Sequence, residues 1–507
     1  MDYQHNQNPW SAYDPPEKYN FLDGFLTEKR EAIFGFAILA GGLWMMNGFI
    51  FGGMNLSFAL ALLFCTAAAA LYLRSSGRKG DWYSRTLLIL SALIIPGFIR
   101  SDDIFVKFVL GNFLFVGINL GLVAMAGRLK WDPSTVYSLL EPFRSFFGLG
   151  FGKVGDSFRG IRDAVRQGGE GVKKGSAVLM GALVAIPILV IMIPLLMRSD
   201  AAFEGLLELL PEFEFDELFA TVVFGFGMAA VLYSRTVALV RGDLPVPAIH
   251  RERKGIHPLT LITALSAVCA LYVVYLFSQL AYFVGGFAGI LPEGYSLAEY
   301  ARRGFFEMAW LCVINLSLMI LAIGLTRKVE GRAPLATRLL CLFIGGVTLF
   351  FVIAAGAKMV LYIGTYGMTR MRILTMVIMV FLGIATATVS AWLFLPKLPY
   401  MKILVIVALV MGCIVLWADV NSIVASYNVD AYLSGRLADI DLSHLRGLGD
   451  SAVPQLDRLA REAQNADVAK IAREMLENWW FEEDPDLRAW NWADHLAREI
   501  LKQHKGG

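Results

Sequence analysis

The chain has 507 residues, of which 57% are hydrophobic and only 17% are charged, and its mean hydropathy is +0.58. This composition is too apolar for an ordinary soluble domain and predicts a membrane protein whose first partner is the lipid bilayer. The formal net charge of +2 gives no broad positive field, so nucleic acid is excluded as an expected partner.

Residues 1–30 are polar and lack the basic start and small-residue cleavage site of a signal peptide, so we interpret them as a polar cytoplasmic N-terminal segment. Beyond them, windows of roughly twenty apolar residues, enough to cross about 30 Å of hydrocarbon as helix, predict about eleven spans. The expected fold class is therefore all-α, a polytopic helical membrane protein with a small helical C-terminal domain. The predicted spans centre near residues 42, 64, 92, 116, 187, 229, 271, 315, 352, 384 and 410.

The predicted spans form a first group within residues 31–127 and a second group within residues 176–418, separated by a basic loop over 128–175. Lys and Arg gather after the second, fourth, sixth and eighth spans, whereas the loop after the fifth span is acidic. Because short cytoplasmic loops carry the excess of Lys and Arg, we expect a cytoplasmic N-terminus and, with an odd number of spans, an extracytoplasmic C-terminus. Pro96 in the third span predicts a kink or a tight hairpin.

The basic loop contains "GLGFGKVG" at 148–155, which matches G-x-G-x-x-G. The dinucleotide-binding fingerprint needs a preceding strand and a βαβ unit, and neither is expected here. Apolar residues from Phe151 onward instead share one helical face, and basic residues occupy the rest. This pattern predicts an interfacial amphipathic helix on an anionic leaflet, with a solvated linker as the alternative. The predicted membrane-surface residues are Lys153, Arg159, Arg162 and Arg166.

Ionisable residues inside apolar runs are costly and tend to face a partner or a cavity. The sequence offers Lys107, Glu307, Lys358 and Asp419, and the expected orientation places the last three toward the outer leaflet. We expect Glu307 to pair with Lys358 first and with Arg303 second, and snorkelling to the interface is the alternative. The predicted outer cluster, a candidate ligand site, consists of Glu299, Arg302, Arg303, Glu307, Lys358, Arg370, Arg372, Asp419 and Asn421.

From residue 419 to 507 the long apolar runs stop, and apolar residues recur at i, i+3 and i+4 among charged ones. This pattern predicts an extracytoplasmic helical domain, which is also the candidate surface for a protein partner. Its Trp479, Trp480, Trp490 and Trp492 are expected in the core of that domain, with the lipid interface as the alternative.

The sequence shows no catalytic, metal or cofactor site. All six histidines lie outside the spans without H-E-x-x-H, and the five cysteines lie in apolar runs without C-x-x-C. An enzyme would therefore have to use carboxylates. Asp102 and Asp103, in a short outer loop, are similar to the acidic residues of multi-span glycosyltransferases, which makes that activity a minor alternative. Acids at this position are more typical of helix capping.

Three stretches carry a resemblance to a known family: "LPEGYSLAEYARRGFFEMAWLCVINLSL", "YIGTYGMTRMR" and "DVNSIVASYNVDAYLSGRLADIDLSHLRGLGDSAVPQL". Over about residues 180–460 the chain resembles an uncharacterised bacterial family of multi-pass membrane proteins, known only as a domain of unknown function. The stretch Y-A-R-R-G-F-F-E is its most specific part. The resemblance implies a bacterial cytoplasmic (inner) membrane and supplies no activity, ligand or catalytic residue.

Two functions are compatible with these patterns. The first is a transporter-like or solute-binding membrane protein, which binds a small solute or a lipid at the predicted outer cluster. The second is a non-transporting membrane sensor or assembly scaffold, whose outer domain contacts a protein partner. Transporters are typically built from internal repeats, and no convincing repeat is visible here, which weighs against the first. A cavity reaching the Glu307 region would favour it.

Overall fold

The computed structural model describes residues 29–100, 103–155, 215–242, 256–287, 305–326, 333–481 and 486–505, together with the isolated residues Ala185, Met192 and Leu196. Within these ranges the chain is built from helices and their connections, and β pairing is limited to one bridge between Ile256 and Thr326. The predicted all-α fold class is confirmed.

Ten helices in the described ranges are long and apolar enough to cross a membrane. They coincide with ten of the predicted spans, from the one centred near residue 42 to the one centred near residue 410. The other predicted span, centred near residue 187, lies outside the described residues apart from isolated positions. The chain is therefore a multi-pass integral membrane protein.

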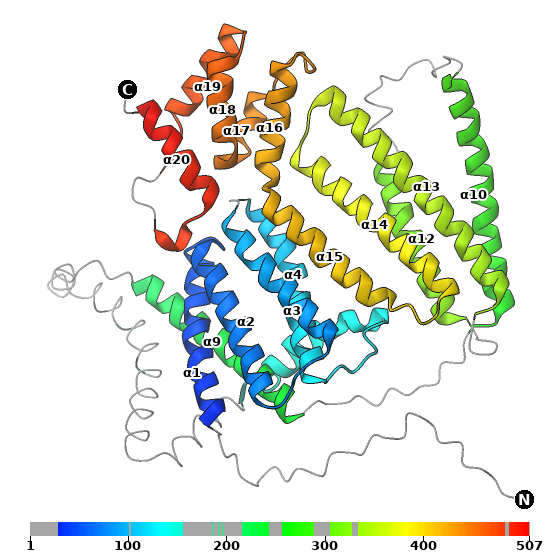
Figure 1. Cartoon of the computed structure of the whole chain (residues 1–507), viewed down its shortest axis with the longest axis horizontal. Helices are drawn as coiled ribbons and strands as arrows, with labels where there is room; N and C mark the ends of the chain where they lie inside the picture. The colour runs from blue at the N-terminus through cyan, green and yellow to red at the C-terminus, as the bar shows by residue number, and fades with distance from the viewer. Residues whose placement is uncertain are drawn as a thin grey trace, which may run out of the picture.

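The spanning helices form two groups that lie side by side in Figure 1. The larger group contains α1 (Lys29–Ile50), α2 (Leu56–Ser75), α3 (Trp82–Ile94), α4 (Ile104–Ala126), α9 (Phe215–Arg241) and α15 (Tyr400–Ala418). The smaller group contains α10 (Pro258–Phe287), α12 (Phe305–Leu325), α13 (Leu335–Tyr366) and α14 (Arg370–Phe394). The groups meet where α14 packs on α15. Helices that are distant in the sequence, such as α1 and α9, are thus neighbours in space.

Two polar contacts define one end of the larger group. The guanidinium of Arg30 donates to the carbonyl oxygen of Ser75, and Arg241 forms a 2.7 Å ion pair with Glu31. These contacts bring together the start of α1, the end of α2 and the end of α9, and we call this the basic end. The short elements η2 (Val136–Leu140), α5 (Glu141–Phe143) and the π-helical η3 (Arg144–Phe151) follow α4 there, and η3 packs on α9.

The C-terminal domain lies at the opposite end of the helices, which we call the domain end (Figure 1). Here α16 (Val420–Leu433) continues beyond α15, and the chain then forms α17 (Leu442–Arg446), η4 (Gly449–Ala452), α18 (Val453–Glu462), α19 (Ala466–Glu477), η5 (Leu487–Ala489) and α20 (Trp492–Lys505). The apolar faces of α18 and α19 pack together, and Leu456, Leu459 and Leu476 are fully buried between the helices. The C-terminal domain therefore has its own small core, as the helical periodicity predicts.

The tryptophans of the C-terminal domain have different environments. Trp479 is buried, and its indole donates a 3.0 Å hydrogen bond to Oδ1 of Asp450. Trp480 is 82% exposed and Trp492 is 46% exposed. The prediction of a core position is therefore confirmed for Trp479 and wrong for Trp480 and Trp492, whose side chains are exposed.

Local sequence signals explain several helix boundaries. The carboxylate of Asp103 accepts a 3.0 Å hydrogen bond from the backbone N–H of Val106 and so caps α4 at its N-terminus. The capping interpretation of this acid is confirmed. At Pro96 the helix α3 gives way to the 3₁₀ segment η1 (Ile95–Ile99), because proline lacks the N–H that an α-helix needs. The break in the α-helix thus falls at the predicted proline, and the predicted kink itself stays a prediction.

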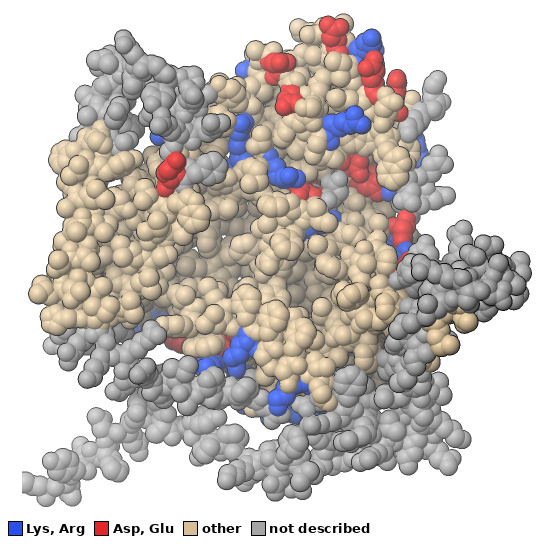
Figure 2. Space-filling model, turned by 180° about the vertical axis from the view of Figure 1, so that it is seen from behind, with Lys and Arg blue, Asp and Glu red and all other residues tan. Residues whose placement is uncertain are grey.

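The surface charge follows the helix arrangement. Figure 2 shows one face with a broad band free of charged side chains across its middle, and with charged groups above and below that band. Large apolar side chains such as Ile353, Phe277 and Trp310 are exposed on the spanning helices. Exposed apolar surface of this extent matches the hydrocarbon of a bilayer rather than water.

Candidate functional site

The predicted pair of Glu307 and Lys358 lies in the smaller group. Glu307 stands in the first turn of α12 with an exposed side chain, and Lys358 is half-buried on α13. The two groups interact electrostatically, but the ion pairs within 4.0 Å among described residues do not include this one. Glu307 therefore has the exposed position that snorkelling requires. Glu299, Arg302 and Arg303 of the predicted outer cluster lie outside the described residues.

Arg370 connects the two helix groups. It stands at the start of α14, and its guanidinium forms a 2.8 Å ion pair with the Asp103 carboxylate at the start of α4. The Asp103 side chain is 2% exposed, whereas that of Arg370 is 37% exposed and also lies over the ring of Phe105. This pair therefore fixes two distant parts of the chain to each other.

Arg372 holds the connection between α13 and α14. Its guanidinium donates to the carbonyl oxygens of Tyr366 and Gly367, and lies 4.1 Å from the ring centre of Tyr362. Gly367 has a φ of 76°, a left-handed conformation that favours glycine. Arg372 thus satisfies carbonyl groups that the end of α13 leaves without helical partners.

Asp419 and Asn421 shape the junction between α15 and α16. Asp419 has a φ of 48°, and its carboxylate accepts a 3.3 Å hydrogen bond from the backbone N–H of Ser422. The amide of Asn421 donates a 3.0 Å hydrogen bond to the carbonyl oxygen of Leu448. Asp419 therefore caps α16, and Asn421 connects α16 to η4 of the C-terminal domain through the residue before it, Leu448.

The predicted membrane-surface residues are described only in part. Lys153 lies just after η3, while Arg159, Arg162 and Arg166 lie outside the described residues. Before it, "GLGFG" belongs to the π-helical end of η3 and its following turn rather than to a strand and a nucleotide-binding loop. Phe147 and Phe151 are exposed and stack with their ring centres 5.8 Å apart. The amphipathic helix stays a prediction.

A partly open cavity of about 300 Å³ lies among the helices of the larger group, where the sequence predicts no site. It is lined by α1, α2, α4 and α9, with single side chains from η1, from η3 and from the connection between α1 and α2. Most lining residues are Met, Phe, Leu and Ile, and side-chain oxygen or nitrogen comes only from Thr66, Asn119, Arg235 and Thr236. This is the form that small-molecule sites typically take, an apolar chamber with a few convergent polar groups.

Arg235 is the charged residue of this cavity. Its side chain lies on α9, is 3% exposed, and donates to Oδ1 of Asn119 on α4. Its Nε is buried without a hydrogen-bond partner. Among the described residues no carboxylate forms an ion pair with it. An arginine at the centre of a membrane span costs roughly 2.5 to 3.5 kcal/mol on insertion scales, and an ionisable residue buried within a span is a functional candidate by default.

The sequence shows Arg235 near the end of an apolar run, a position that suggests an exposed interfacial arginine rather than a buried one. The residue lies six positions before the end of α9, or about 9 Å of helix, close enough to the interface for an arginine to be expected to snorkel. Its burial comes from α1, α2 and α4, which cover α9. Periodicity within one span does not reveal these contacts between distant segments.

Other buried charges of the larger group have partners within it. Lys107 is 1% exposed and donates to Oδ1 of Asn55. Glu31 accepts from Arg241 at 2.7 Å and from the hydroxyl of Tyr233 at 2.7 Å. Arg235 likewise has a neutral acceptor, Asn119, and it differs from these residues in lining the cavity.

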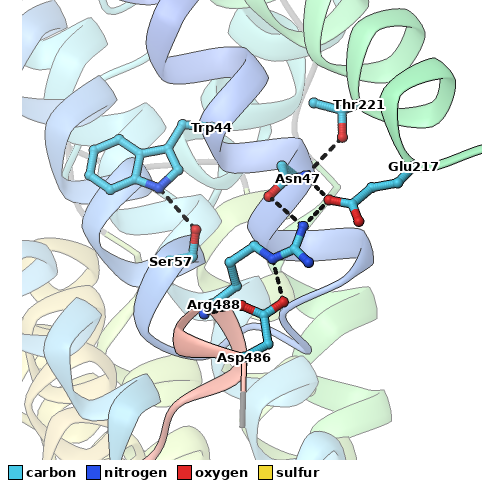
Figure 3. A network of polar contacts seen from close by, with 7 residues as sticks. All are labelled: Trp44, Asn47, Ser57, Glu217, Thr221, Asp486 and Arg488. Carbon is cyan, nitrogen blue, oxygen red and sulfur yellow. Dashed lines mark hydrogen bonds and ion pairs between the residues drawn. The ribbon is translucent and has the colours of Figure 1, made fainter. Parts of the chain in front are cut away.

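The C-terminal domain contacts two cavity-lining helices at the domain end. Figure 3 shows Arg488 of η5 between α1 and α9, where its guanidinium contacts Glu217 and Asn47 and also pairs with Asp486. The Asn47 amide donates to Glu217 at 2.9 Å and to Thr221 at 3.0 Å. One side chain of the C-terminal domain thus bridges two helices of the membrane region.

Comparisons with known proteins add a family but no activity. The family model for a domain of unknown function, DUF4153, matches residues 87–459, which is more than half of the chain. This range includes Asn119 on α4 and Arg235 on α9, whereas α1 and α2 precede it. No curated protein matches the chain, and no solved structure does.

Proposed function

This chain belongs to the DUF4153 family, whose function is unknown, and we propose that it binds a small solute or a lipid inside its larger helix group, as transporter-like membrane proteins do. The observation that carries the proposal is the cavity of about 300 Å³ with the buried Arg235. The cost of burying that guanidinium without a carboxylate is explained if the group serves a ligand.

The predicted outer cluster supports this function less well than the cavity does. Its described members Arg370, Arg372, Asp419 and Asn421 are engaged in capping and in contacts between elements. A ligand site at Glu307 and Lys358 stays a prediction.

A cysteine introduced at Gly111 tests whether the cavity is reached from water. Gly111 lines the cavity on α4, and an added Cβ would meet no atom closer than the Phe98 ring at 4.0 Å. In a chain whose native cysteines are replaced by alanine, we expect Gly111→Cys to react with a charged, membrane-impermeant thiol reagent. Gly346→Cys on α13, which faces away from the protein, is the matched control and should stay unmodified.

The side from which labelling occurs separates two roles. A transporter exposes its site alternately to both sides of the membrane, so reagent added to either side should modify Gly111→Cys. A receptor that only binds should be labelled from one side. Absence of labelling from both sides, with the protein folded, would contradict an accessible site.

A non-transporting membrane sensor or scaffold is the second candidate. The observation that favours it is the contact of Arg488 with Asn47 on α1 and Glu217 on α9. Because α1 and α9 also line the cavity, a shift of these helices on ligand binding would act directly on the C-terminal domain and on a protein partner bound there. Ligand-dependent hydrogen exchange in residues 486–492, with labelling from one side only, would support this role.

We further propose that the basic end faces the cytoplasm of a bacterial inner membrane, which leaves the C-terminal domain outside. The support is the gathering of Arg30, Arg74, Arg78, Arg128 and Arg241 near the ends of α1, α2, α4 and α9, together with the preference of Lys and Arg for cytoplasmic loops. Reporter fusions at Lys79 should read cytoplasmic, and fusions after Gly507 should read external. The reverse pattern would refute this orientation.

A further inference from the structure

The chemistry of the cavity is uneven along its length. On α9 the polar lining residues Arg235 and Thr236 lie close to the basic end. Toward the domain end the lining consists of Phe49, Phe58 and Phe98, with methionines between them. One end of the cavity therefore offers a positive charge, and the other offers only apolar surface.

The charge is available to a ligand because Arg235 has more N–H donors than the polar groups described beside it accept. The Thr236 hydroxyl donates to the Leu232 carbonyl oxygen at 2.7 Å, and the Asn119 amide donates to the Phe115 carbonyl oxygen at 2.8 Å. Arg235 has five N–H donors. One of them is given to Oδ1 of Asn119, and the Nε–H has no hydrogen-bond acceptor. A guanidinium with spare donors in an apolar chamber selects an anion such as a carboxylate or phosphate, which accepts two parallel hydrogen bonds.

The apolar part suits one hydrocarbon chain. Lining residues on α1 run from Ile38 to Phe49, which is about 16 Å of helix axis. The volume of about 300 Å³ is at the lower end for small-molecule sites, and fits one chain better than the two chains of a phospholipid. Met45, Met46 and Met54 add flexible, adaptable surface.

We propose that the cavity binds a single-chain anionic amphiphile, with its carboxylate or phosphate headgroup at Arg235 and its hydrocarbon chain directed toward Phe98. The inference rests on the proposed function and names the ligand class of that site. The headgroup lies near the basic end, and the chain lies along α1 and α4.

The test uses the full chain in discs of neutral phosphatidylcholine, because a detergent is itself a single-chain amphiphile. The probes are palmitate, hexadecyl phosphate, hexadecanol, hexadecyltrimethylammonium and dipalmitoyl phosphatidic acid, and binding is measured directly with labelled compounds. We expect saturable one-to-one binding of palmitate or hexadecyl phosphate, at least tenfold tighter than hexadecanol, and none of the ammonium compound. Comparison of the two anions identifies the headgroup.

Variants locate the two halves of the ligand. Arg235→Gln should weaken binding of the anions at least tenfold without affecting hexadecanol, whereas Arg85→Gln, an equal charge change at an exposed site, should have no effect. Gly111→Leu should block every probe by filling the chain region without changing any charge. Gly346→Leu on the outer face of α13 is its matched control.

The outcomes separate this inference from the proposed function. If hexadecanol binds as tightly as palmitate and Gly111→Leu blocks both, the cavity is a binding site but the anion selectivity is refuted. If phosphatidic acid binds as well as the single-chain anions, the single-chain assignment is refuted. If no probe binds the wild-type protein, both the inference and the occupancy of this cavity by amphiphiles are refuted.

Discussion

The larger and smaller helix groups bury polar side chains in different ways. The larger group encloses Arg235, Lys107 and Glu31 and contains the cavity. In the smaller group the buried polar side chains of the described residues are neutral, as in the hydrogen-bonded set of Tyr272, Asn315 and Thr348. The interior of the larger group therefore contains charged side chains that could recognise a ligand, whereas the described interior of the smaller group contains apolar and neutral side chains that pack its helices together.

The difference indicates which group carries function. Neutral hydrogen bonds between spans are worth about 0.6 kcal/mol on average and need no functional explanation. A buried arginine is costly enough that packing alone does not explain it. We therefore interpret the smaller group as a structural support for the larger one. The two groups are joined by the packing of α14 on α15 and by the Asp103–Arg370 ion pair.

The largest effect is expected at the junction of the two groups. Arg370→Met removes the cation from a carboxylate that is 2% exposed, and we expect a loss of about 3 kcal/mol in stability, near the lower limit for breaking a buried pair. Asp103→Asn should cost less, because the guanidinium that remains is 37% exposed and can be hydrated. Thermal unfolding in detergent measures both.

Arg461→Met is the control for the junction. Its ion pair with Asp457 is within one helix, and the arginine side chain is 69% exposed, so the expected loss is at most about 1 kcal/mol. Equal losses for Arg370→Met and Arg461→Met would show that the junction pair does not join the groups energetically.

Two glycines on α4 distinguish tight packing from the cavity. A Cβ at Gly117 would approach Ser91 Oγ to 2.8 Å and Leu409 Cδ2 to 2.9 Å, so Gly117→Ala should destabilise the protein by about 2 kcal/mol through overpacking. A Cβ at Gly111 faces the cavity, and Gly111→Ala should be neutral or stabilising because alanine favours helix. If the two variants lose equal stability, the space beside Gly111 is not available.

The sequence predicts the fold of this protein much better than its site. Ten spans and the Asp103 cap follow from apolar length and local capping chemistry, which depend on neighbouring residues. The environment of Arg235 depends on Asn119, more than a hundred positions away, and on α1 packing against α9. The outer cluster is predicted from charge near apolar runs, and that pattern also describes capping residues such as Arg372 and Asp419.

A smaller effect is expected where the C-terminal domain meets the larger group. Arg488→Ala removes the bridge to Asn47 and Glu217 and should cost about 1 kcal/mol, the typical value of such hydrogen bonds. Amide hydrogen exchange in residues 486–492 should increase, because this segment would open more often. Lys470→Ala, whose side chain is 75% exposed, should leave exchange there unchanged. Unchanged exchange in Arg488→Ala would show that the bridge does not hold the domain.

The smallest effect is expected inside the smaller group, at Asn315. This residue accepts from the Tyr272 hydroxyl at 2.6 Å and donates to the Thr348 hydroxyl at 3.0 Å, and so connects α10, α12 and α13. Asn315→Leu keeps the branching of the side chain at Cγ and should cost about 0.6 kcal/mol for each of the two bonds that it removes, because hydrogen bonds between membrane helices have modest net strength.

The Thr348 hydroxyl keeps a 2.7 Å bond to the Ile344 carbonyl oxygen, so Asn315→Leu leaves that donor satisfied. Thermal unfolding and amphiphile binding should both be measured, and binding should not change, since Asn315 lies in the smaller group rather than in the cavity wall. A loss above about 4 kcal/mol would exceed twice the largest value known for one interhelical hydrogen bond, about 1.7 kcal/mol, and would contradict a purely supporting role. A loss of binding without a loss of stability would place functional chemistry in the smaller group and reverse the assignment of roles.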